Sequence, residues 1–193
     1  MAQAAGRAGA RLAASATPAV AGREPRAAMA ACMGCLNEFI ELGALECLGA
    51  SEATPVTNAF EEGDAELVSD TDAQLLIKVT FRSPVKLSGF SIKGAQDDSA
   101  PNIVKLFVNK PNIGFDEASD EEPLQAVELT PEEVEKDEQK QLRFVKFQNV
   151  FTLQMFVEAN AGGIEDQTKV KGIKFFGCPE QAMDMKDWKP IKG

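Results

Sequence analysis

Short apolar segments separated by turn residues are the feature that most limits how this chain can fold. The strand-length runs cover residues 75–81, 85–92, 103–108, 142–147, 153–157 and 170–176. In 103–108 and 153–157 successive side chains alternate in character, which places neighbouring residues on opposite faces of a strand. The spacing between runs leaves little room for crossover helices. We therefore predict an all-β fold, built as an antiparallel sandwich or barrel.

Two short helices are predicted beside the strands. The better marked one begins at Thr130, because Thr130 can cap it, Pro131 occupies its first position and Glu133 can complete a capping box. The segment 35–42 is expected to form one or two helical turns that pack against the sandwich. The acidic run 116–122 is interpreted as a solvated loop, since runs of like charge usually stay in water.

The first thirty residues differ in composition from the rest of the chain. They are rich in alanine and contain Arg7, Arg11, Arg23 and Arg26 with a single acid, Glu24. This composition is typical of an organellar transit peptide, but also of a disordered extension. We therefore divide the chain into a disordered or targeting tail, 1–30, and one folded domain, 36–190. The expected location is the cytoplasm or nucleus, or a mitochondrion or plastid if the tail is a transit peptide.

Charge and composition exclude several classes of function. The chain of 193 residues carries a net charge of −10, which argues against nucleic acids and anionic membranes as partners. No apolar run is long enough to be inserted across a bilayer. The chain has no histidine, so the Ser-His and Cys-His pairs and the usual metal ligand are missing. We predict no catalytic residues, no cofactor and no metal, and expect another protein as the partner.

Cys32 and Cys35 form a C-x-x-C pair that could in principle be a redox site. In a thioredoxin-type site, a strand delivers the pair to the start of a helix, where backbone amides stabilise the thiolate. The alanine-rich segment upstream of Cys32 shows no such strand. A zinc site would also need Cys47 and Cys178, which do not form a second close pair. Ordinary reduced cysteines are the favoured interpretation, with Cys47 as a small buried residue.

Five side chains are candidates for an interaction surface. Four lysines lie in predicted strands among apolar neighbours: Lys78, Lys105, Lys146 and Lys174. Several of them are expected to share an outer sheet face, which would suit an acidic partner. Solubility and protection of sheet edges are the alternative explanation. Trp188 is expected either to hold the C-terminal segment against the sandwich or to anchor a partner.

Four longer blocks of sequence carry a resemblance to a known family. They are DAQLLIKVTFRSPVKL (72–87), PNIVKLFVNKPNIGFDEA (101–118), LRFVKFQNVFTLQMFVEAN (142–160) and GCPEQAMDMKDWK (177–189). With LGALECLGAS at 42–51, they resemble in order and spacing the PITH domain, the proteasome-interacting thioredoxin domain found in thioredoxin-like proteins and also alone. Gly49 departs from the asparagine common in that family, and Cys178 occupies a small-residue position of the closing turn.

The resemblance implies a jelly-roll β-sandwich similar to galactose-binding-like domains, without established catalytic residues and with a role in docking on the proteasome. Our leading prediction is therefore a non-enzymatic protein-interaction module that associates with the proteasome or a similar large assembly. Two alternatives stay open: a thiol redox protein that uses Cys32 and Cys35, and a small-ligand or sugar-binding jelly roll. The second alternative rests on fold analogy alone.

Overall fold

The computed structural model describes residues 34–180 except for five single positions, Glu62, Asp64, Ala95, Pro111 and Glu165. Its strands are β1 (Gly34–Cys35), β2 (Glu46–Leu48), β3 (Leu67–Val68), β4 (Leu75–Lys93), β5 (Pro101–Val108), β6 (Gln125–Glu128), β7 (Lys140–Gln141), β8 (Val150–Asn160), β9 (Lys169–Val170) and β10 (Gly172–Pro179). Its helices are α2 (Phe115–Asp120) and α3 (Pro131–Glu135), with 3₁₀ turns η1 (Asn37–Phe39), η2 (Leu42–Ala44), η3 (Val56–Ala59) and η4 (Phe144–Lys146).

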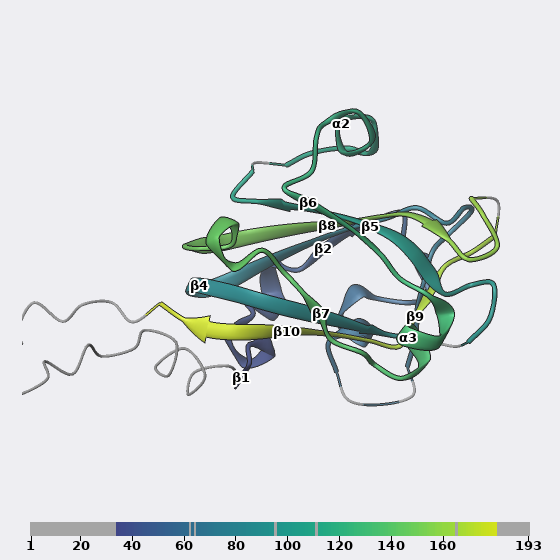
Figure 1. Ribbon diagram of the computed structural model, residues 1–193. Helices are drawn as coiled ribbons and strands as arrows, with labels where there is room; N and C mark the ends of the chain where they lie inside the picture. The colour runs from purple at the N-terminus through teal and green to yellow at the C-terminus, as the bar shows by residue number, and fades with distance from the viewer. Residues whose placement is uncertain are drawn as a thin grey trace, which may run out of the picture.

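All the strand pairs are antiparallel within the residues described. The main sheet follows the order β1-β10-β4-β8-β5-β6, with β2 and β7 also paired to β4, and β3 pairs with β9 in a small second sheet. Figure 1 shows these strands as two layers, with β5, β6 and β8 in one and β7 and β10 in the other. The predicted antiparallel β-sandwich is confirmed.

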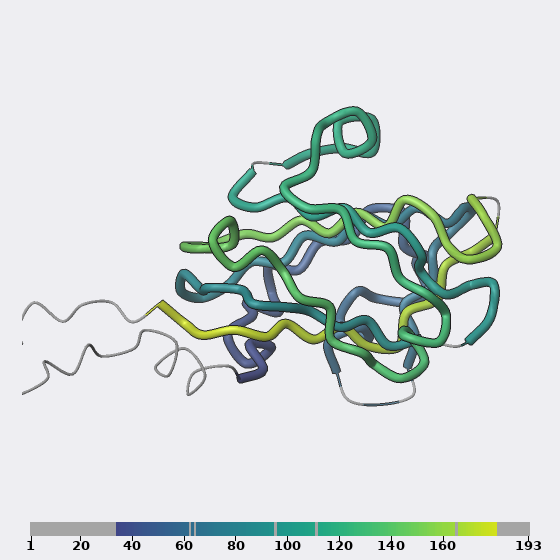
Figure 2. The backbone as a smooth tube through the Cα atoms, in the orientation of Figure 1, coloured from purple at the N-terminus to yellow at the C-terminus, as the bar shows by residue number. Residues whose placement is uncertain are grey.

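Strand β4 connects the two layers. Its first half pairs with β8 as far as Thr80, the register then shifts before Val85, and the second half pairs with β10 and β7. Figure 2 shows the chain turning sharply at this place. Pro84 has no N–H to donate to the ladder, so the bend lies where pairing to β8 is interrupted. The two runs predicted on either side of Ser83-Pro84 are therefore the two halves of one bent strand.

The alternation read from the sequence separates two apolar clusters. Leu153, Met155 and Val157 of β8 face the space between the layers and belong to the main core, in which each is fully buried. Phe156 points to the opposite face of β8, where it joins Leu76, Phe107, Ile113 and Ala118 in a second cluster. Helix α2 supplies Ala118 to this cluster. The part of the outer face around Phe156 is therefore covered by α2 and by Ile113 of the segment before it.

The predicted helix after Thr130 is confirmed as α3. The Thr130 hydroxyl accepts a hydrogen bond from the Glu133 N–H at 3.4 Å, and the Glu133 carboxylate accepts one from the Thr130 N–H at 2.8 Å. These two bonds complete the capping box. The hydrogen bond from the Lys140 ammonium and, to a smaller extent, those to Thr130 lower the pKa of the Glu133 carboxyl.

Two local predictions were wrong, and a third was confirmed. The segment 35–42 does form a short helical turn, η1, which follows the end of β1, and Leu36 and Ile40 on either side of this turn are buried in the main core. The run 142–147 is a loop containing η4, in which Phe144 and Phe147 follow the three-residue spacing of a 3₁₀ turn. The acidic run 116–122 is helical up to Asp120, since Ala118 and the preceding Phe115 pack on the second cluster.

Candidate functional site

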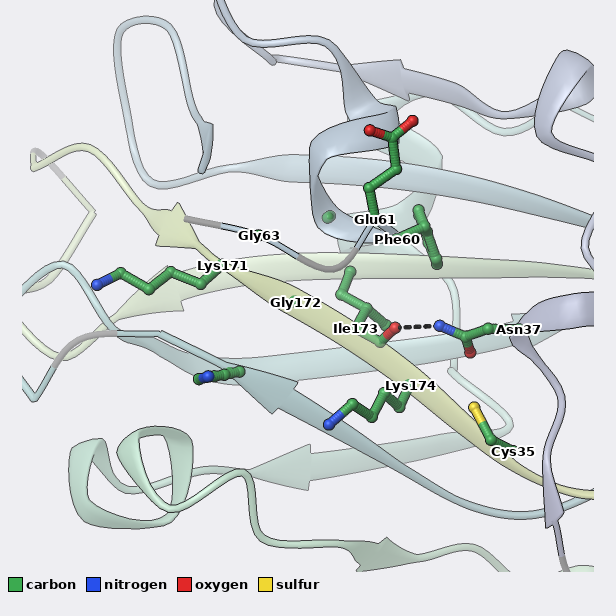
Figure 3. A pocket seen from close by; sticks show the side chains of 11 residues that line it. Cys35, Asn37, Phe60, Glu61, Gly63, Lys171, Gly172, Ile173 and Lys174 are labelled. Atoms are coloured by element: carbon green, nitrogen blue, oxygen red, sulfur yellow. Dashed lines mark hydrogen bonds between the residues drawn. The ribbon is translucent and has the colours of Figure 1, made fainter. Parts of the chain in front are cut away.

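A hollow of about 370 Å³ lies beside β10, and we call it the basic hollow. Ala59, Phe60 and Ile173 supply apolar side chains to its lining. Its charged groups are Glu61 and three lysines: Lys93, Lys171 and Lys174. Figure 3 shows Lys171 and Lys174 extending to one side of β10, with Cys35 and Asn37 at the other end. With three lysines and one carboxylate, the lining of this hollow is net positive although the chain as a whole carries a net charge of −10.

Asn37 closes the edge of β10 where β1 ends. Its side-chain amide donates to the Ile173 carbonyl at 2.7 Å, a bond drawn in Figure 3, and its carbonyl oxygen accepts from the Phe175 N–H at 3.0 Å. The Leu36 N–H also donates to the Phe175 carbonyl at 2.8 Å. One side chain thus takes the place of a neighbouring strand and protects the edge from further pairing.

Two of the three lysines are engaged in ion pairs. Lys171 lies 3.3 Å from the Glu66 carboxylate, and the Lys174 ammonium contacts the Asp137 carboxylate. Asp137 also accepts a 2.6 Å hydrogen bond from the Ser91 hydroxyl. Ser91 is fully buried, so a substrate cannot reach this serine and the cluster is a structural tie between α3–β7 and β10. Lys93 is exposed and forms no ion pair with the described residues.

The cysteines lie in different environments. Cys35 is exposed at the rim of the basic hollow, whereas its predicted partner Cys32 lies outside the described residues. Cys47 is half-buried in β2, and burial raises the pKa of its thiol to about 12. Cys47 therefore remains a neutral thiol at physiological pH. Among residues 34–180 with the five gaps noted, no group of three or more cysteines and carboxylates is arranged to hold a metal ion.

The four predicted lysines occupy three different places. Lys78 and Lys105 share the outer face beside α2, where Lys78 pairs with Glu46 at 3.0 Å and Lys105 with Glu158 at 2.9 Å. Lys174 belongs to the other layer, at the basic hollow. Lys146 lies on η4, in a loop. The structure thus brings two of the four together. Trp188 lies outside the described residues.

Sequence reasoning missed the residues that complete the basic hollow. Asn37, Lys93 and Lys171 were not singled out, although Lys93 and Lys171 each flank an apolar run. Their juxtaposition depends on the pairing of β10 with β4, which joins segments far apart along the chain. Charge at strand ends was the only signal for the basic hollow present in the sequence.

None of the helices within the described residues is long and apolar enough to cross a membrane.

Comparison with known protein families gives a match over most of the chain. The family model described as PITH domain matches residues 27–192. Thioredoxin-like protein 1 of Schizosaccharomyces pombe is 35% identical over 149 residues, which is 75% of this chain and 51% of that protein. PITH domain-containing protein 1 of Homo sapiens is 31% identical over 137 residues, 68% of this chain and 63% of that protein. The chain thus spans about half to two thirds of these relatives.

Solved structures with a similar fold are small β-sandwich domains. A family 32 carbohydrate-binding module of Clostridium perfringens NanJ in complex with galactose has a TM-score of 0.55 at 8% identity, over 75% of this chain and 98% of that chain. An F5/8 type C domain from Bacteroides fragilis has a TM-score of 0.52 at 10% identity, over 77% of this chain and 98% of that chain. At such low identity the likeness concerns the fold, and it confirms the predicted galactose-binding-like jelly roll.

Proposed function

This chain belongs to the PITH domain family, and from this premise we propose that it is a non-enzymatic protein-interaction module that associates with the proteasome. The observation that carries the proposal is the match of the family model to residues 27–192, which include every described strand. The resemblance found in the sequence implies docking on the proteasome. A rigid sandwich that presents side chains from fixed strands and anchored loops suits such a role.

The groups found in the structure support binding more than catalysis. The serine that contacts Asp137 is buried, and the Cys47 thiol is protonated at neutral pH. Lys171 and Lys174 at the basic hollow are held by carboxylates of the chain itself. An enzyme needs a reacting group that is both accessible and activated, and these groups lack one or the other property. The proposal therefore assigns the chain a binding surface.

Co-purification tests the association. The full chain with an affinity tag is expressed in a eukaryotic cell, and captured proteins are identified by quantitative mass spectrometry, with the tag alone as control. We expect proteasome subunits to be enriched at least tenfold over the control at moderate salt. Enrichment of no proteasome subunit, in extracts where the tagged chain is intact, would count against the proposal.

Location follows from the same proposal. We propose that the protein resides in the cytoplasm or nucleus, where it would meet the proteasome, unless residues 1–30 act as a transit peptide that directs it to a mitochondrion or plastid. Fluorescent fusions of the full chain and of residues 31–193 separate the two cases. An identical cytoplasmic and nuclear distribution is expected for both. Organellar signal from the full-length fusion alone would place the protein elsewhere.

A redox function is the first alternative, and thiol reactivity tests it. We expect iodoacetamide at pH 8 to alkylate the exposed Cys35 readily and Cys47 at least a hundredfold more slowly, because the thiolate is the nucleophile and the pKa of Cys47 is raised to about 12. Peptide mass spectrometry measures both rates. Reduction of a disulfide substrate by the wild type, lost in Cys35→Ser, would establish the redox alternative and contradict the non-enzymatic proposal.

Sugar binding is the second alternative, and it is favoured only by fold neighbours such as the module bound to galactose. Sugar sites usually stack an aromatic ring on the sugar, whereas this chain has no tyrosine and one tryptophan. A glycan array incubated with the full chain tests this alternative. We expect no glycan to bind above background.

A further inference from the structure

The loop between β7 and β8, together with the first two residues of β8, is tied by hydrogen bonds to distant parts of the chain. We call this segment, residues 143–151, the 143–151 loop. The backbone N–H of Arg143 donates to the Gln125 side chain at 2.9 Å, and the Phe147 side chain inside the loop is fully buried. The Asn109 side chain donates to the Asn149 carbonyl and accepts from the Phe151 N–H, each at 2.8 Å. The loop is therefore fixed at its start, its middle and its end.

This fixed loop exposes side chains that contribute little to the fold. Val145 is 87% exposed, the highest value among the large apolar residues in the described part of the chain, and Phe151 is 48% exposed. A single exposed apolar residue needs no explanation. Here two of them lie on one hydrogen-bonded segment together with the exposed cations Arg143 and Lys146. Arginine and aromatic side chains are the residues that most often dominate protein interfaces.

A groove of about 310 Å³ begins beside Lys146. Phe107, Val108, Pro123 and Leu124 supply apolar atoms to its lining, and its charged groups are Lys110, Lys146 and Glu122. The cation Lys110 is held by Glu121. Within the described residues, by contrast, neither Lys146 nor Arg143 forms an ion pair, so both charges are available to a partner.

We propose that the 143–151 loop and the adjoining groove are the surface that binds the partner, and that the partner contributes an acidic segment with an apolar side chain. The inference rests on the proposed function and names the surface that serves it. The apolar side chain would enter the groove, and carboxylates would meet Arg143 and Lys146. The basic hollow also gathers cations, but Lys171 and Lys174 there are paired with Glu66 and Asp137, whereas Arg143 and Lys146 form no ion pair with the described residues. A loop that is already ordered loses little conformational entropy on binding.

Charge reversal tests the surface against a matched control. The double variant R143E/K146E and the control K93E/K136E change the net charge equally, and the control alters the basic hollow and α3 instead. Binding of the full chain to purified proteasome is measured by biolayer interferometry, and thermal melting verifies folding. We expect the first variant to weaken binding at least tenfold and the control to stay within twofold of wild type. Val145→Ser, which adds no charge, should weaken binding at least threefold.

The possible outcomes distinguish the surface from the function. If R143E/K146E and V145S bind within twofold of wild type, the surface is overturned and the proposed function stands. Equal losses in R143E/K146E and K93E/K136E also overturn it, because general charge would then explain the effect. If the wild type itself does not bind, the proposed function fails and the surface fails with it.

Salt dependence tests the charge of the partner segment. The affinity of the wild type for the proteasome must fall between 50 and 300 mM salt, because contacts between exposed charges are screened (Debye length about 8 Å at 0.15 M). An affinity that does not change with salt would contradict an acidic partner segment.

Discussion

Two regions of this molecule combine apolar and basic side chains, and they use them in different ways. On the outer face of the β5–β8 layer, Phe156 is fully buried beneath α2, and Lys105 pairs with Glu158 while its ammonium lies 5.9 Å from the Phe156 ring centroid. On the 143–151 loop, Val145 and Lys146 project into solvent. In the covered face, the basic residues complete an internal contact. In the loop they are left for a partner, so similar residue types have different roles.

The largest difference between the two regions is expected in the free energy of unfolding when one phenylalanine in each, Phe156 or Phe151, is replaced by alanine. Phe156→Ala removes a fully buried ring and leaves a cavity under α2, so it should cost about 3–5 kcal/mol. Phe151→Ala removes a half-exposed ring and should cost less than about 1 kcal/mol. Urea titration followed by circular dichroism measures both. Similar losses for the two variants would mean that the loop is packed as firmly as the covered face.

A smaller difference is expected for the two lysines. Lys105→Ala removes a pair with Glu158 in which the lysine side chain is 15% exposed, together with the packing of its stem on Phe156, and should cost about 1–2 kcal/mol. Lys146→Ala should change stability by less than about 0.5 kcal/mol. A Glu158→Gln variant supplies the control, because it should weaken the effect of the Lys105 substitution and leave that of Lys146 unchanged. An equal cost for both lysines would remove the distinction between the regions.

Which side chains share the covered face was accessible to sequence reasoning because alternation is a local signal, whereas its covering by α2 was not predicted. Alternation along 103–108 and 153–157 places Lys105 and Phe156 on the opposite side from the core residues, as the structure confirms. What the pattern could not give was the layer to which each strand belongs. Lys174 alternates equally well in β10, yet β10 pairs with the second half of β4 and lies in the other layer. Grouping the lysines therefore required the topology.

The 143–151 loop was not predictable because the residues that shape it are distant. Its apolar side chains resemble a strand, but Gln125 and Asn109 bond it from positions 18 and 42 residues away along the chain. Asn149, with φ of 53°, supplies the left-handed conformation that lets the chain enter β8, one that asparagine adopts more readily than most residues. These contacts decide that Phe147 is buried and Val145 is not. No window of local sequence contains that information.

The smallest effect on stability, and the sharpest separation of folding from binding, is expected at Val145. Val145→Ala should change the free energy of unfolding by less than about 0.5 kcal/mol, since an 87% exposed side chain gains little from folding. The matched change Val104→Ala, at a fully buried position of β5, should cost about 2 kcal/mol. Thermal unfolding measures both, and interferometry measures binding. A loss above about 1 kcal/mol in Val145→Ala would show that this side chain supports the fold, and its exposure would then no longer argue for a partner.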